Sequence, residues 1–213
     1  MRKWAFGVGA LVALGLTGCG PRYGKRVPSE MVTKLPYETR IELLEAENLL
    51  AVAVDKVDEA ENELNRTRAA IRRAKKQHDA ADDQIDDAKD DTSREVAKLA
   101  RDEAEARIDY LRARQDVNDQ EHDLAELSLR CAHARFEVAR LIAAKKAKVE
   151  DAAGLDQKDF DEQVNACDAE VKAQRAEEKP AQDKLEAQQA SWEKSKEALA
   201  QKTFAARASP YVE

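Results

Sequence analysis

Seven aspartates crowd into one short segment of the chain, and clustered carboxylates can bind Ca²⁺ or attract a basic protein. They are Asp79, Asp82, Asp83, Asp86, Asp87, Asp90 and Asp91. A calcium-binding loop needs alternating oxygen ligands, a central glycine and a later glutamate, and that order is absent here. A solvated helix end is the simplest interpretation of the cluster. If the segment has a function, we expect it to bind a basic protein partner rather than a metal ion.

Cysteine and histidine are the other residue types that commonly carry chemistry. Cys131 and His133 are two residues apart and point to different faces of a helix, so they make a poor metal-binding pair. His78 falls where a polar side chain commonly fixes the register of packed helices. The chain contains no glycine-rich phosphate loop, nucleophile elbow or HExxH motif. We therefore predict that the protein is not an enzyme and uses no metal or other bound cofactor.

The N-terminus has the layout of a secretory signal peptide. Arg2 and Lys3 are positive, and an uncharged apolar run from Trp4 to Leu16 follows them. This run is shorter than the roughly 20 apolar residues that span a bilayer, which favours a signal peptide over a membrane-spanning helix. It leads directly into Leu16, Thr17, Gly18 and Cys19.

These four residues resemble the lipobox of bacterial lipoproteins, in which a leucine and two small residues precede a cysteine. The resemblance covers about the first 20 residues. It implies cleavage before Cys19 by signal peptidase II, and acyl chains such as palmitate attached to Cys19. In similar lipoproteins of two-membrane bacteria, an aspartate after the cysteine retains the protein at the inner membrane. Gly20 stands there, which implies the outer membrane, facing the periplasm. The alternative is an ordinary signal peptide, or an uncleaved membrane anchor, with a chance cysteine.

Composition indicates long helices rather than a thick globular core. Charged residues make up 37% of the chain and aromatic residues 5%, with only 7 glycines and 5 prolines. The net charge is −7, and removal of residues 1–18 with Arg2 and Lys3 makes it −9. An acidic chain of this kind is not expected to bind nucleic acid.

Four regions follow from these patterns. Residues 1–18 form the signal peptide, and 19–35 the lipidated cysteine with a flexible linker that contains Pro21, Gly24 and Pro28. Residues 36–205 form a helical coiled-coil rod, with helices at 36–89, 93–152 and 156–205. Residues 206–213 form a C-terminal tail.

Heptad spacing is strict in the first helix. One row of mostly large residues contains Leu43, Leu50, Val57, Leu64, Ile71, His78 and Ile85. A second row, three residues later each time, is almost all alanine: Ala46, Ala53, Ala60, Thr67, Ala74, Ala81 and Ala88. This 3-4 spacing predicts a coiled-coil seam that a partner helix can approach closely, within one chain or between chains.

Capping signals separate the three helices. Thr92 and Glu95 form a capping-box sequence that predicts the start of the second helix, and Gly154 is suited to end it. Asp156 is suited to cap the third helix, in which Pro180 should cause a kink or a break.

Short connections make neighbouring helices antiparallel and predict an elongated all-α three-helix coiled-coil bundle. With a tight turn near Gly154, the third helix should reach back only to about residue 104, leaving a projecting two-helix tip on the order of 20 Å long. In this register Cys167 faces about residue 142, so a disulfide with Cys131 would require a different register. We therefore expect both cysteines to be small buried apolar residues, with the disulfide as the alternative.

These features favour a lipid-anchored structural protein of the cell envelope. Such a spacer or scaffold would bind an envelope protein through its coiled-coil surface or acidic tip. One alternative is a periplasmic holdase that grips clients with apolar surface near the tip. Another is an accessory subunit that docks end-on in an efflux or secretion complex.

Overall fold

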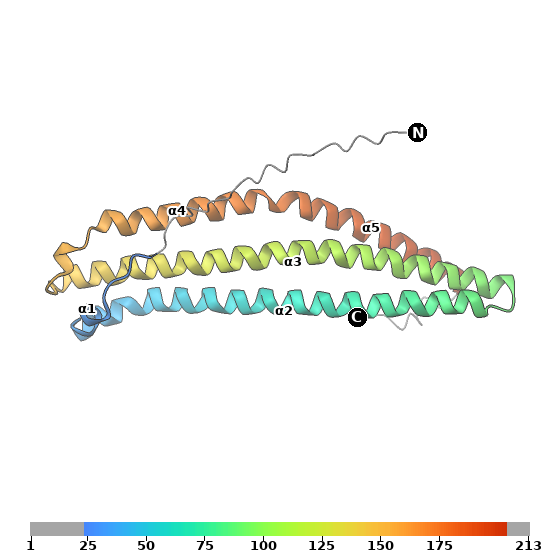
Figure 1. The fold of residues 1–213 in the computed structure, drawn as a ribbon, viewed down its shortest axis with the longest axis horizontal. Coiled ribbons are helices and arrows are strands. Elements are labelled where there is room, and N and C mark those ends of the chain that lie inside the picture. The colour runs from blue at the N-terminus through green and yellow to red at the C-terminus, as the bar shows by residue number, and fades with distance from the viewer. Residues whose placement is uncertain (1–23, 204–213) are drawn as a thin grey trace, which may run out of the picture.

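The computed structural model describes residues 24–203, and every regular element in that range is a helix. The elements are α1 (Ser29–Thr33), α2 (Tyr37–Asp87), α3 (Asp91–Lys146), the short 3-10 helix η1 (Ala152–Gly154), α4 (Gln157–Ala176) and α5 (Glu178–Thr203). The all-α class is therefore confirmed. Figure 1 shows α2, α3 and the α4–α5 pair side by side in an elongated molecule.

Helix α3 lies in the middle, with α2 on one side and α4 and α5 on the other (Figure 1). Both predicted rows of α2 face inwards, because every one of their residues is buried or half-buried. Asn118 of α3 donates a hydrogen bond to Thr67 of α2 at 2.8 Å, and both side chains are buried. The heptad seam of α2 is thus covered by α3 of the same chain.

Two helix boundaries agree with the predicted signals. The side chain of Asp156 caps α4 by accepting a hydrogen bond from the Lys158 amide at 3.0 Å. The third helical stretch breaks at Glu177, so that Pro180 falls in the first turn of α5. Proline is tolerated there because the first amides of a helix have no carbonyl partner within the helix.

Both ends of α3 differ from the prediction. Asp90, not Thr92, is the N-cap: its carboxylate accepts hydrogen bonds from the backbone and hydroxyl of Ser93, each at 2.7 Å. At the other end α3 stops at Lys146, and Gly154 belongs to η1. The chain turns through Lys148 and Asp151, which have positive φ angles of 54° and 70°. The connection from α3 to α4 is therefore longer than the tight turn that was expected.

This longer connection changes the register of the third stretch. Lys202 of α5 pairs with Glu95 of α3 at 2.9 Å, whereas the prediction brought the third helix only to about residue 104. Only the first turn of α3 precedes Glu95. The prediction of a long two-helix tip was wrong, because α4 and α5 together extend along almost the whole of α3.

Candidate functional site

The seven predicted aspartates lie where α2 ends and α3 begins. We call the segment Asp79–Asp91 the acidic turn. Its two ends are bound within the molecule. His78 Nδ1 lies 3.5 Å from an Asp82 carboxylate oxygen, and Arg94 lies 3.7 Å from Asp91. The hydrogen bonds from the Ser93 amide and then its hydroxyl hold the pKa of Asp90 below its ordinary value. Asp90 therefore stabilises the start of α3 as an ionised carboxylate.

The middle of the acidic turn is exposed. Asp83, Asp86 and Asp87 are exposed, and none of them makes a hydrogen bond or ion pair with the part of the chain that the structure describes. No group of three or more His, Cys, Asp or Glu residues within residues 24–203 has the geometry to hold a metal ion. Chemically, the turn can present unpaired negative charge to a basic surface.

The predicted lipidation site, Cys19, and the other lipobox residues, Leu16, Thr17 and Gly18, lie outside the described residues. The same is true of the predicted tail at 206–213. The first described residue is Gly24, five positions after Cys19. No helix in the described range is long and apolar enough to cross a membrane.

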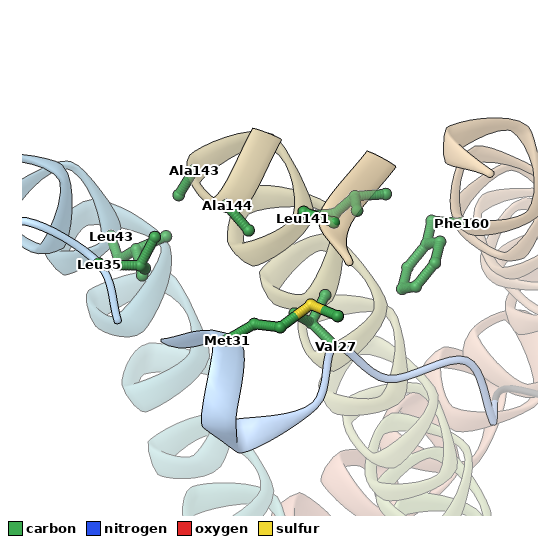
Figure 2. Packing of buried hydrophobic residues seen from close by; sticks show 9 residues of the cluster. Val27, Met31, Leu35, Leu43, Leu141, Ala143, Ala144 and Phe160 are labelled. Carbon is green, nitrogen blue, oxygen red and sulfur yellow. The ribbon is translucent and has the colours of Figure 1, made fainter. Parts of the chain in front are cut away.

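Part of the predicted flexible linker is instead packed against the helices, which corrects that prediction. We call residues 24–36 the strap. Val27, Met31 and Leu35 of the strap are 2%, 8% and 2% exposed, respectively. Figure 2 shows these three side chains in one cluster with Leu141 of α3 and Phe160 of α4. Their spacing of four residues was the signal in the sequence, but the nearby prolines obscured it.

Polar contacts also hold the strap in place. The amide of Lys25 donates to Gln163 of α4 at 3.0 Å, and the amide of Val27 donates to Glu137 of α3 at 2.7 Å. The Lys25 ammonium hydrogen-bonds Asp159, and this bond raises the pKa of Lys25. The chain therefore joins the rod beside the start of α4, at the end opposite the acidic turn (Figure 1).

A disulfide links Cys131 of α3 to Cys167 of α4, with 5.5 Å between their Cα atoms. The expected register placed Cys167 opposite residue 142 and disfavoured this bond. Because α3 ends early and the connection is long, Cys167 lies opposite Cys131 instead. Both cysteines are nearly inaccessible, with 1% and 0% of their surfaces exposed.

One polar cluster that joins α5 to α3 was not anticipated from the sequence. Glu103 interrupts the apolar pattern of α3, yet it is only 7% exposed. Its carboxylate accepts a hydrogen bond from Trp192 Nε1 at 2.6 Å. The Trp192 ring stacks on Tyr110 with 5.0 Å between centroids, and Arg107 lies over the same ring. The sequence contained two signals for this cluster. A carboxylate, Glu103, stands at a position of α3 where an apolar residue would be expected, and Trp192 is one of only 2 tryptophans in the chain.

Comparison with known proteins identifies no relative of this chain. No protein family, no curated protein and no solved structure matches it.

Proposed function

We propose that the protein is a lipid-anchored envelope lipoprotein, a coiled-coil spacer that holds a basic protein partner away from the outer membrane. The observation that carries this proposal is the separation of the two ends of the rod. The strap enters the rod at one end, five residues after Cys19, and the acidic turn lies at the other end. A lipid on Cys19 would thus fix one end of the rod at the membrane and place the unpaired aspartates of the acidic turn at the end far from the membrane.

The distances follow from chain geometry. The five residue steps from Cys19 to Gly24 span at most about 18 Å, so the membrane-facing end of the rod would be held close to the bilayer. Helix α2 has 51 residues, which corresponds to a length of roughly 75 Å at 1.5 Å per residue. Its seam with α3 stiffens the rod in the manner of a coiled coil. The protein would act by geometry and not by catalysis.

The Cys131–Cys167 disulfide supports an exported location. Disulfides form and persist in oxidising compartments such as the bacterial periplasm, and they are rare in the cytosol. A protein that carries this bond is suited to the periplasmic face of the outer membrane, which is the location that Gly20 implies.

A holdase is the second candidate, because α2 exposes apolar side chains such as Leu44 and Leu49. These residues lie towards the start of α2, away from the acidic turn where a client-gripping tip was expected. The docking subunit of an efflux or secretion complex is a further alternative, for which end-on contact through the acidic turn would suffice.

The partner can be tested by site-specific photocrosslinking in cells. A crosslinking amino acid at Asp87 should capture a single basic envelope protein, and added salt should weaken the complex because exposed charges are screened. Glu61, an exposed acidic position in the middle of α2, serves as the control. Capture of the same protein from both positions, or of nothing from Asp87, would contradict a partner at the acidic turn. Capture of many unrelated unfolded proteins would favour the holdase.

A further inference from the structure

Exposed apolar side chains are concentrated in one part of the molecule. Within residues 24–203, six of the seven exposed large hydrophobic residues lie between Tyr37 and Val54 of α2. Single exposed apolar residues are ordinary, but a contiguous group marks an interaction surface. Leu49 is 61% exposed and Val52 is 50% exposed, so both side chains would gain from being covered.

Leu49 and Val52 form one wall of a groove. Helix α3 lines the floor with small residues such as Ser128 and Ala132 and also with Arg135 and Phe136. Helix α4 provides the opposite wall, where Val171 lies among the charged residues Asp168, Lys172 and Arg175. The groove has a volume of about 560 Å³, enough to admit several side chains of a docking helix. The apolar wall of α2, with the small residues of α3 beside it, is suited to receive one face of another helix.

The charges along this wall identify the helix that fits. Glu45, Leu49, Val52 and Lys56 are spaced four, three and four residues apart, which places them along one face of α2. Neither Glu45 nor Lys56 makes a hydrogen bond or ion pair with any described residue, although the adjacent Glu42 pairs with Lys146. When a second copy of this helix runs antiparallel, the acidic residue of each copy lies opposite the basic residue of the other, and the apolar residues lie opposite each other. The face is therefore complementary to itself.

We propose that the chain forms a symmetric dimer in which this face of α2 docks against the same face of α2 from a second copy. In such a dimer Leu49 of each copy contacts Val52 of the other, and Glu45 of each copy pairs with Lys56 of the other. A two-fold axis makes the surface self-complementary and closes the assembly at two copies. The inference does not depend on the lipid anchor or on the partner of the acidic turn.

Charge reversal tests this pairing without disturbing the interior. Sedimentation equilibrium of the full chain in a density-matched detergent should show a reversible monomer–dimer equilibrium. The single variants Glu45→Lys and Lys56→Glu should each weaken the dimer on the order of tenfold. Each change replaces two attractive exposed pairs per dimer with two repulsive ones.

The double variant Glu45→Lys with Lys56→Glu should restore dimerisation, because the pairs are then re-formed with their signs exchanged. Glu47→Lys is the matched control: it makes the same change in net charge at an exposed position on another face of α2, and it should leave the dimer constant unchanged. Circular dichroism checks that each variant stays helical. A wild-type chain that is monomeric at all concentrations, a double variant as weak as either single one, or an equal effect of Glu47→Lys would overturn the proposal.

Discussion

Loss of the Cys131–Cys167 disulfide should strongly destabilise the folded chain. The bond joins residues 36 positions apart, closing a loop that contains the end of α3, the connection and the first half of α4. In the chain-entropy description, closing a loop of that length destabilises the unfolded state by about 4 kcal/mol at 25 °C. The double variant Cys131→Ala with Cys167→Ala should lose approximately this amount of unfolding free energy.

Guanidinium denaturation followed by circular dichroism measures the loss. Reduced wild type is the matched control, because it lacks the bond but keeps both sulfur atoms in their buried positions. Both proteins should unfold at lower denaturant concentration than oxidised wild type, and the double alanine variant should be the less stable of the two because it also loses buried contacts.

Two results would refute this reasoning. The first is a purified wild-type protein in which Cys131 and Cys167 are both free thiols under oxidising conditions, since α4 would then lie in another register. The second is an unfolding free energy that changes by less than about 1 kcal/mol on reduction, which would mean that the closed loop does not constrain the unfolded chain.

Three further predictions address individual contacts. Trp192→Phe removes the hydrogen bond to the buried Glu103 carboxylate and should lower the unfolding free energy by about 1–3 kcal/mol, measured by urea denaturation. Met31→Ala should cost about 2 kcal/mol and speed amide hydrogen exchange throughout the strap; unchanged exchange would mean that the strap is not held by this side chain. Asp90→Ala should remove the pH dependence of the stability of the first turn of α3. Because Ser93 lowers the Asp90 pKa in the folded chain, capping is complete above about pH 4 and is lost as pH falls through that lower pKa. Amide exchange of Ser93 measured between about pH 5 and pH 2 should show this loss in wild type alone.

Local patterns predicted the helices well, because the signals that form a helix lie within a few residues of one another. The heptad rows of α2 face inwards as predicted, with α3 of the same chain as the covering helix, and the break before Pro180 is present. The N-cap of α3 was misassigned by two residues. Asp90, Asp91, Thr92 and Ser93 can all cap a helix, so composition alone does not choose among them.

Features that depend on distant residues were not predictable in the same way. The disulfide and the reach of α5 both follow from where α3 ends, and that end depends on turn geometry at Lys148 and Asp151. The strap was interpreted as a linker because Val27 and Met31 are buried in a cluster whose other members, such as Leu141 and Phe160, are distant in the sequence. In the candidate site, the sequence located the aspartates of the acidic turn, while the structure separated those bound at its ends from those left unpaired.

We propose that Cys19 holds one end of the rod at a membrane, with the acidic turn at the far end. Mass spectrometry of the intact protein, extracted from membranes of cells expressing the full chain, tests this most directly. We expect a chain that begins at Cys19 and carries acyl chains on that residue, and Cys19→Ala should abolish both the cleavage and the lipid. A chain with an unmodified Cys19 thiol, or one cleaved elsewhere, would show that the rod is not anchored through this cysteine.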